Sequence, residues 1–312
     1  MHSRRYTLAM SHTVFIIGGP TASGKSALAM LLAEKIPAVI INADSMQVYR
    51  EIPIIGAHPT PEEQKIIPHR LYSIMGAEER GSVSRWCELA KAAIEATFKA
   101  EKVPVLVGGT GMYLLSLMKG ISDIPTMDDE IRDQAQAELD AMGHEKFHAR
   151  LAEKDPEAGE RIKIGDSQRL IRAWGVYLQT GIALSTWHQK KLEPYLPHVT
   201  YKGIFLNPGR EVLYKRSDAR FLSMLENGAM EEVISLWERK LDPSLPAMRA
   251  HGVPELIEYL DGRTTREKAV IDAQTHTRNY IKRQLTWHRN QMPMLPECGT
   301  PEAALELLLK NT

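Results

Sequence analysis

Short apolar runs alternate with helix-like patterns along the first third of the chain. Residues 13–17, 38–41 and 103–107 form continuous apolar runs of strand length. Residues 26–35 and 88–102 instead carry apolar positions at helical spacing. Strands that are apolar throughout are typical of a parallel sheet with helices on both faces. The pattern therefore predicts an α/β fold built on a parallel sheet.

The pattern changes near residue 121, where helical periodicity continues but strand signals become rare. Residues 123–160 carry twelve acidic residues against four Lys and Arg. A strand pattern returns at residues 201–206, and it is followed by a second series of helical patterns. These later helices are expected at residues 211–227, 230–240, 253–260 and 265–290. The simplest layout is a core of residues 1–120 and 198–312, interrupted by a helical insertion domain of residues 121–197.

Composition narrows the class of protein but does not name its partner. The chain has 312 residues, with 39 Lys and Arg against 39 Asp and Glu, so its formal net charge is +0. Two cysteines, Cys87 and Cys298, are too few for a disulfide scaffold or a four-cysteine metal site, and they favour a reducing, cytoplasmic compartment. Zero net charge provides no overall attraction to nucleic acid, so any such affinity must come from local charge.

Neither a membrane span nor a targeting segment is expected. The longest notable uncharged stretch, residues 103–118, is shorter than the roughly 20 apolar residues that a span needs, and glycines interrupt it. At the N-terminus, Met10 is a second candidate for the first residue.

The strongest motif follows the first predicted strand and precedes the first predicted helix. It has the form G-x-x-x-x-G-K-[ST], in which loop amides and a helix N-terminus bind phosphate oxygens. Lys25 supplies a mobile cation, and Ser26 offers a hydroxyl to Mg²⁺. The motif predicts a nucleotide-type di- or triphosphate site without distinguishing ATP from other ligands. Its residues are Gly19, Pro20, Thr21, Ala22, Ser23, Gly24, Lys25 and Ser26.

Two further strand ends carry candidate chemistry. Asp44 follows the second strand, and three roles are open for it. It can bind Mg²⁺ through water, act as a general base, or cap the next turn. The third strand ends in Gly108-Gly109-Thr110-Gly111 and has no acid, which argues against a routine motor ATPase. Thr110 is either a hydrogen-bond donor to a bridging oxygen or the N-cap of the next helix.

Together these motifs resemble the tRNA dimethylallyltransferase family of bacterial type, over about residues 14–289. The similar segments, in order, are GPTASGKS (19–26), DSMQVY (44–49), PHRL (68–71), VGGTG (107–111), DSQRLIR (166–172) and KRQLTWHR (282–289). DSMQVY and KRQLTW are much more specific than the phosphate loop. The resemblance implies a P-loop NTPase-like core with a helical insertion and a helical C-terminal region.

The resemblance also implies a reaction. The dimethylallyl group of dimethylallyl diphosphate passes to N6 of the adenosine 3′-adjacent to the tRNA anticodon, and diphosphate is released. Asp44 is then expected to accept the amine proton, and Thr110 to hydrogen-bond the departing oxygen. Lys25, the loop amides and Mg²⁺ at Ser26 would stabilise the diphosphate. Arg216 is a further candidate for the diphosphate, although a solvated helix face is the alternative for it.

Local charge fits an RNA partner. Residues 263–289 hold seven Lys and Arg against two acids, and residues 161–172 hold four against one. Such clusters suit the phosphates of an anticodon stem-loop. Trp287 either stacks on a base or belongs to the core. We expect a monomer with tRNA and dimethylallyl diphosphate as partners. Implied tRNA contacts are Asp44, Ser45, Met46, Gln47, Thr110, Arg132, Gln168, Arg169, Leu170, Ile171, Arg172, Lys282, Arg283 and Gln284.

One segment departs from the family pattern, and alternative functions remain open. Where relatives often read I-G-T-A-K-P, this chain has Ile55-Gly56-Ala57-His58-Pro59, which lacks the threonine and has His58 in place of the lysine. Alternatives are an adenylate isopentenyltransferase, a nucleotide kinase-like phosphotransferase, or a non-catalytic, nucleotide-switched RNA-binding module. Labelled donor offered to tRNA and to AMP would distinguish them.

Overall fold

The computed structural model describes residues 12–189 and 192–310, so the candidate start at Met10 lies outside the described residues. The chain divides into two compact units. Unit 1 comprises Met1–Lys119 and Pro194–Thr312, and unit 2 comprises Gly120–Glu193. No helix in the described part of the chain is both long and apolar enough to cross a membrane.

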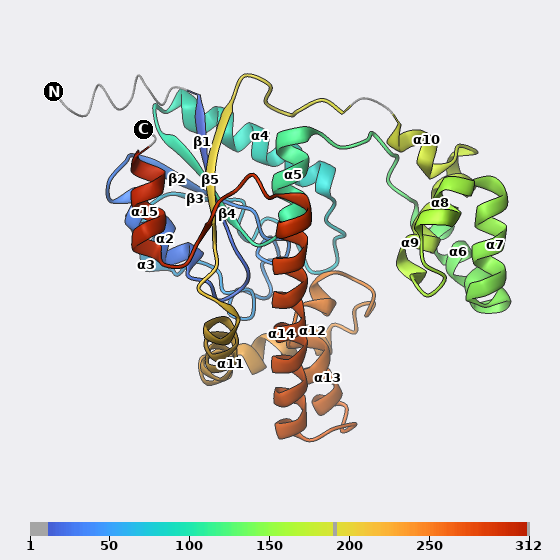
Figure 1. The fold of residues 1–312 in the computed structure, drawn as a ribbon. Coiled ribbons are helices and arrows are strands. Elements are labelled where there is room, and N and C mark those ends of the chain that lie inside the picture. The colour runs from blue at the N-terminus through green and yellow to red at the C-terminus, as the bar shows by residue number, and fades with distance from the viewer. Residues whose placement is uncertain (1–11, 190–191, 311–312) are drawn as a thin grey trace. The chain divides into compact units, whose positions relative to one another are not determined.

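Unit 1 is built on a parallel sheet of six strands, which confirms the predicted α/β class (Figure 1). The strand order is β3-β2-β4-β1-β5-β6, so β1, which leads into the phosphate loop, lies between β4 and β5. The strands are β1 (Thr13–Gly18), β2 (Ala38–Asn42), β3 (His69–Arg70), β4 (Val103–Gly108), β5 (Thr200–Leu206) and β6 (Glu297–Cys298).

The described helices of unit 1 are α2 (Lys25–Ala33), α3 (Pro61–Ile66), α4 (Val83–Lys99), α5 (Gly111–Lys119), α11 (Arg210–Glu226), α12 (Ala229–Glu238), the 3₁₀ helix η1 (Ala247–Arg249), α13 (Val253–Leu260), α14 (Arg266–Gln291) and α15 (Pro301–Lys310). The predicted core strands and C-terminal helices lie within a few residues of these bounds. The elements that were not predicted include the two-residue strands β3 and β6, the short helices α3 and η1, and the helix α15.

Side chains alternate across the sheet and enter two cores, one on each face. Val14 and Ile16 of β1 point into a core with α4 and α5, whereas Phe15 and Ile17 point into a core with α2 and α15. Figure 1 shows these two helix pairs on opposite sides of the strands. Burial of both faces explains why the strands read as continuous apolar runs.

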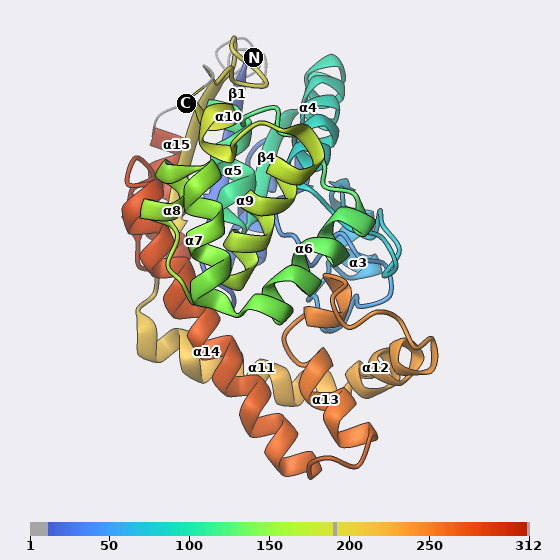
Figure 2. The same cartoon turned by 90° about the vertical axis from the view of Figure 1, so that its right-hand side faces the viewer.

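Helices α11 to α14 pack against one another and extend unit 1 beyond the sheet (Figures 1 and 2). The longest, α14, also contacts α5. It thereby brings residues from the end of the sequence next to the loop after β4. This helix completes the candidate site described below.

The regular elements in the described residues of unit 2 are all helices, and the unit has a small core of its own. Asp155 is buried, and it caps the N-terminus of the helix that begins at Pro156 by accepting from the Ala158 amide, while its second oxygen accepts from the Ser185 amide. The aromatic rings of Phe147 and Trp174 fill the centre of the unit. The helices of unit 2 are α6 (Asp129–Met142), α7 (His144–Lys154), α8 (Pro156–Arg161), α9 (Ser167–Thr180) and α10 (Leu184–His188).

Candidate active site

The phosphate loop connects β1 to α2 and depends on two glycines. Gly19 has φ +156°, and a Cβ there would lie 2.7 Å from both the Leu206 carbonyl oxygen and Ser23 Oγ. Gly24 caps α2 in the left-handed region, with φ 98°. The N-terminus of α2 therefore opens directly onto the loop, as an anion site requires.

Inside the loop, Lys25 Nζ donates a hydrogen bond to the Pro20 carbonyl oxygen at 2.8 Å. Burial lowers the Lys25 pKa to about 8, an effect that Asp44 opposes and Arg220 reinforces. Ser23 Oγ is buried and has no hydrogen-bond partner among the described residues. Ser26 is exposed at the start of α2. The loop thus presents a cation and hydroxyls that a bound anion can engage.

An arginine reaches the loop from α11. Arg220 donates a short hydrogen bond to Thr21 Oγ1, although the two residues lie far apart in sequence. Burial lowers the Arg220 pKa, and the nearby Asp44 carboxylate opposes that effect. Arg216, the residue proposed from the sequence, is exposed one helical turn earlier. The structure therefore favours Arg220 over Arg216 as the arginine at the phosphate loop.

Asp44 is held by its neighbours immediately after β2. The buried Asn42 accepts a hydrogen bond from the Asp44 amide at 2.7 Å and donates to its carbonyl at 3.0 Å. Asp44 Oδ1 accepts from the Met46 amide at 3.0 Å. A Cβ on Gly109 would lie 3.5 Å from Asp44 Oδ2. One carboxylate oxygen is therefore fixed by the backbone, while the glycine leaves space beside the other.

Thr110 lies next to this segment, so the ends of β2 and β4 bring two of the predicted residues together. The Ser45 amide donates to Thr110 Oγ1 at 2.9 Å, and the Thr110 hydroxyl donates to Ser45 Oγ at 3.2 Å. The Thr110 and Tyr280 side chains are also within hydrogen-bond distance of each other, which places Tyr280 of α14 at this site. Burial raises the pKa of Tyr280, so its phenol stays neutral at physiological pH.

Gln284 on α14 connects the phosphate loop with the loop that follows β4. Its Oε1 accepts from the Thr21 amide at 3.0 Å, and its Nε2 donates to the Gly109 carbonyl at 3.1 Å. The side chain is 8% exposed. We expected Gln284 to contact RNA, but here both ends of its amide hold protein backbone. The neighbouring Lys282 and Arg283 are exposed on the same helix.

Two cavities of about 270 Å³ each adjoin these residues and share Tyr280 and Arg283 in their walls. The first is largely apolar. Its walls include Thr110, Trp287 and the ring of His288, which stacks on Phe205 with centroids 3.6 Å apart. Trp287 is half-buried in this wall, so it belongs to the site rather than to a closed core.

The second cavity is more polar. It is lined by Thr21 of the phosphate loop, by Asp44, and by the three arginines Arg220, Arg249 and Arg283. Phe221 and Met224 of α11 add an apolar surface. Guanidinium groups next to the loop make this cavity suited to an anionic group, whereas the first cavity suits an uncharged one.

Gln47 also differs from expectation. The family resemblance implied a tRNA contact for it, but its Nε2 donates to the Gly56 and Ala57 carbonyls at 3.0 and 2.7 Å. The loop in which this chain departs from the family pattern is therefore bound to the segment that contains Asp44.

Within unit 2, the predicted RNA-contact motif on α9 divides into exposed and buried residues. Gln168 and Arg169 are exposed, whereas Leu170 and Ile171 are buried in the core of the unit. The two apolar residues are therefore unsuited to direct RNA contact in this structure. Arg172 donates to the Pro125 carbonyl at 3.3 Å, and burial together with the nearby Arg132 lowers its pKa.

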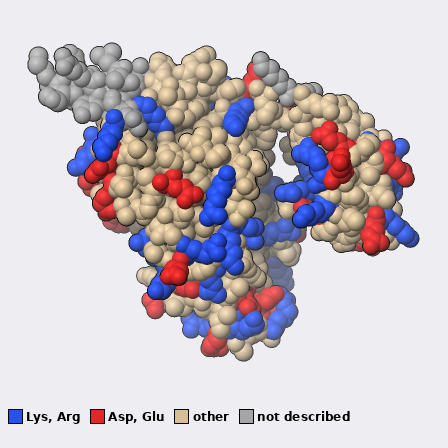
Figure 3. Space-filling view, viewed as in Figure 1, with Lys and Arg blue, Asp and Glu red and all other residues tan. Residues whose placement is uncertain are grey.

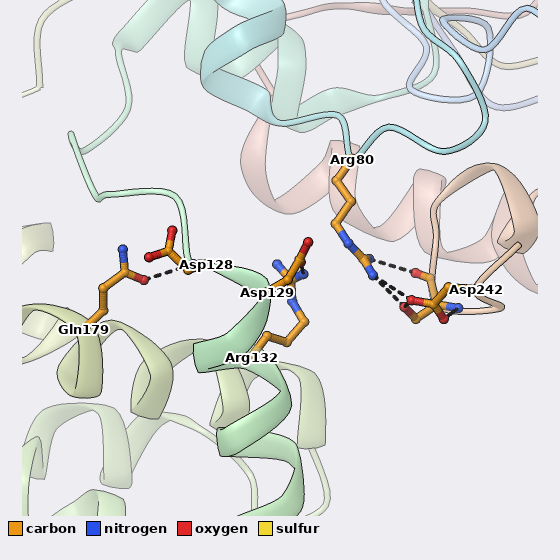
Figure 4. Close-up of polar contacts among 7 residues, drawn as sticks. Arg80, Asp128, Asp129, Arg132, Gln179 and Asp242 are labelled. Carbon is orange, nitrogen blue, oxygen red and sulfur yellow. Dashed lines mark hydrogen bonds and ion pairs between the residues drawn. The ribbon is translucent and has the colours of Figure 1, made fainter.

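Arg132 forms an ion pair with Asp129 at the start of α6, and the Asp128 amide donates to Gln179 Oε1 nearby (Figure 4). Unit 2 thus presents arginines on at least two of its helices. Among the described residues, no group of three or more His, Cys, Asp or Glu side chains is arranged to hold a metal ion.

Comparisons with known proteins agree on one family. The family model described as IPP transferase matches residues 47–291. A tRNA dimethylallyltransferase of Nitrobacter hamburgensis is 46% identical over 292 residues, covering 94% of this chain and 92% of the relative. One from Rhodopseudomonas palustris is 48% identical over 278 residues, covering 89% and 87%.

Solved structures show the same fold. The tRNA isopentenylpyrophosphate transferase of Staphylococcus epidermidis has a TM-score of 0.65 at 32% identity, covering 96% of this chain and 97% of that one. A eukaryotic dimethylallyltransferase captured acting on tRNA has a TM-score of 0.76 at 27% identity, covering 96% and 77%. The chain belongs to the IPP transferase family.

Proposed function

We propose that this protein transfers the dimethylallyl group of dimethylallyl diphosphate to N6 of an adenosine in tRNA and releases diphosphate. The observation that carries the proposal is that Asp44, the phosphate-loop residue Thr21 and Arg220 line one cavity, with Thr110 bonded to the residue after Asp44. Arg220 also binds Thr21 directly. A carboxylate, a hydroxyl and an anion site are the groups that an alkyl transfer from a diphosphate requires. The relatives named above carry the same activity in their names.

The diphosphate is assigned to the cavity that contains Thr21 and Arg220. Negative charge grows on the diphosphate as the C–O bond breaks, and Lys25, the loop amides and Arg220 lie where they can stabilise it. The exposed Ser26 hydroxyl and the unpartnered Ser23 hydroxyl fit this environment. We propose that Ser26 holds Mg²⁺ together with the donor's own oxygens, where the ion offsets part of that charge.

Asp44 is assigned as the general base. The amine N6 forms a bond to the allylic carbon, the carbon–oxygen bond breaks, and its electron pair leaves with the diphosphate. The proton on N6 then passes to the Asp44 carboxylate, whose Oδ1 is already engaged by the Met46 amide. Thr110 is assigned to the bridging oxygen, where it would exchange its bond to Ser45 Oγ for one to the leaving group.

For the acceptor, we propose the adenosine 3′-adjacent to the anticodon, drawn out of its loop to reach the buried groups. Lys282 and Arg283 are exposed on α14 and suit the phosphates of the anticodon stem-loop. Figure 3 shows Lys and Arg side chains gathered over the part of unit 1 that holds α11 and α14. The exposed Gln168 and Arg169, with Arg132 and Arg172, give residues 121–197 a second set of candidate contacts.

One assay tests the proposal against its alternatives. Labelled dimethylallyl diphosphate is incubated with the protein and either tRNA or AMP, with and without ATP. We expect label on tRNA without ATP. Label on AMP would indicate an adenylate isopentenyltransferase. Consumption of ATP without transfer of the label would indicate a phosphotransferase, and neither reaction would indicate a binding module. We place the enzyme in the cytoplasm, acting as a monomer on free tRNA.

A further inference from the structure

Glu232, in the first turn of α12, binds a loop that lies far from it in sequence. Its Oε1 accepts from the Ile54 amide at 2.6 Å, and its Oε2 accepts from the Ile55 amide at 3.0 Å. The carboxylate is half-buried, and burial raises its pKa while the two amides oppose that effect. Its neighbour Gly228 has φ +104°, and a Cβ there would lie 3.1 Å from Ile54 Cδ1. The loop is therefore packed tightly against the start of α12.

The same loop closes on itself and then reaches the segment that contains Asp44. Within it, the Ala57 amide donates to the Ile54 carbonyl at 2.9 Å, and the His58 amide donates to the Pro53 carbonyl at 2.9 Å. Residues 53–58 are called the 53–58 turn below. The carbonyls of Gly56 and Ala57 in this turn are the two acceptors that bind Gln47 Nε2.

Hydrogen bonds thus lead from α12 to Gln47, and three residues of chain connect Gln47 to the candidate base. Glu232 holds the 53–58 turn, the turn holds Gln47, and Gln47 lies three residues after Asp44. Small displacements of a reacting group lower the rate strongly. A residue that fixes this turn can therefore influence chemistry that it does not touch.

Other contacts connect the residues just after α12 with loops near the 53–58 turn, but they are exposed ion pairs. Arg239, the residue that follows α12, lies 3.2 Å from a Glu51 carboxylate oxygen and 2.6 Å from one of Glu78. Arg80 lies 3.0 Å from Asp242 and also binds Ser244 (Figure 4). Solvent and salt weaken such pairs, and they engage side chains rather than the turn backbone.

We propose that Glu232 is a positioning residue of the transfer reaction. By binding the Ile54 and Ile55 amides it holds the 53–58 turn, and through Gln47 it holds the Asp44 segment in the geometry that accepts the adenosine amine. The inference rests on the proposed function. The inference also assigns a role to residues 55–59, where this chain departs from the family pattern. The carbonyls of Gly56 and Ala57 in this segment hold Gln47.

The test uses the whole protein and the variants Glu232→Ala, Glu232→Gln and Arg239→Gln. We expect Glu232→Ala to lower the single-turnover rate at saturating donor and tRNA by about 10- to 100-fold. Donor affinity, measured by calorimetry, should change less than about twofold, because the phosphate loop is untouched. Glu232→Gln keeps one acceptor oxygen and should lie between the wild type and Glu232→Ala. Arg239→Gln, at the C-terminal end of the same helix, should match the wild type.

A double-mutant cycle with Gln47→Ala separates positioning from a general loss of stability. If Glu232 acts through Gln47, the two losses of rate overlap, and the double variant is about as slow as the slower single variant. Rate losses that multiply independently would overturn the inference, as would a wild-type rate in Glu232→Ala. Where Glu232→Ala fails to fold, the same cycle is run with Glu232→Gln. A wild-type protein that transfers nothing to tRNA would instead overturn the proposed function itself.

Discussion

Arg220 of α11 donates a hydrogen bond to Thr21 Oγ1 inside the phosphate loop. This contact places a guanidinium beside the site assigned to diphosphate. We expect Arg220→Gln to weaken binding of the donor by about 30-fold, because a hydrogen bond to a charged group contributes about 2 kcal/mol. Isothermal titration calorimetry with dimethylallyl diphosphate provides the measurement.

Arg216 offers a matched control on the same helix. Its side chain is exposed one turn earlier, so Arg216→Gln should leave the donor dissociation constant within about twofold. If the two variants weakened binding equally, long-range charge rather than the Thr21 contact would explain the effect of Arg220.

Asp44→Asn tests the assigned base with little change of structure. An asparagine Oδ1 can still accept from the Met46 amide, so the segment should keep its conformation. The single-turnover rate should nevertheless fall by about 10²- to 10⁴-fold, the usual contribution of a positioned general base. Filter binding should show tRNA affinity close to that of the wild type. Near-normal turnover would remove Asp44 from this role.

Thr110 allows the hydroxyl to be tested separately from the shape of the side chain. Thr110→Val removes the bonds to Ser45 but keeps the volume, whereas Thr110→Ser keeps the hydroxyl. We expect Thr110→Val to lower the single-turnover rate about tenfold or more with little change in donor affinity, and Thr110→Ser to retain most of the rate. An effect on affinity alone would indicate a structural role.

Some of this site could be predicted because parallel strands end at one edge of a sheet. Asp44 and Thr110 follow β2 and β4, which are neighbours, so a strand pattern with local motifs sufficed to bring them together. Arg220 could not be separated from Arg216 in this way, because packing of α11 decides which helical turn faces the loop. Nothing in the local sequence marked Gln284 as a connector of two loops.

The motif on α9 illustrates a second limit. Matching residues 168–172 as a block does not show which of them face solvent, and the structure buries Leu170 and Ile171. Likewise, the task of the 53–58 turn depends on Glu232, which follows it by more than half the chain length. Such contacts come from tertiary packing, which periodicity along one segment does not encode.

Gly111 should tolerate no larger residue. A Cβ at this position would lie 1.9 Å from Trp287 Cζ3, so Gly111→Ala must displace the indole from the wall of the apolar cavity. We expect a loss of about 1–3 kcal/mol in the free energy of unfolding, measured by urea denaturation. Gly165→Ala is the control, because nothing lies within 4 Å of the Cβ it would introduce.

A second substitution checks the cause of this effect. Trp287→Leu removes the ring that the new methyl group would strike. The penalty of Gly111→Ala should therefore be smaller in the Trp287→Leu background than in the wild type. An unchanged penalty would show that helix geometry at the start of α5, rather than the indole, requires the glycine.

Lys25 should make donor binding depend on pH. Its pKa is lowered to about 8 in the free protein, chiefly by burial, from the ordinary 10.5. Because the Lys25 pKa is lower in the folded protein than in the unfolded chain, its contribution to the free energy of unfolding is fully present above about pH 10.5. That contribution is lost as the pH falls through about 8. A bound diphosphate favours the charged ammonium and raises the pKa again. Binding above about pH 8 must therefore take up a proton.

We expect titration of Lys25 to leave the donor affinity constant below about pH 8. Above that pH the affinity should fall by up to tenfold per pH unit. Calorimetry in two buffers of different ionisation enthalpy, at about pH 9, should show uptake approaching one proton per donor bound. Lys25→Arg stays charged throughout this range, so it should lose the proton uptake even if its affinity is lower. Equal uptake in Lys25→Arg and the wild type would assign the proton to another group.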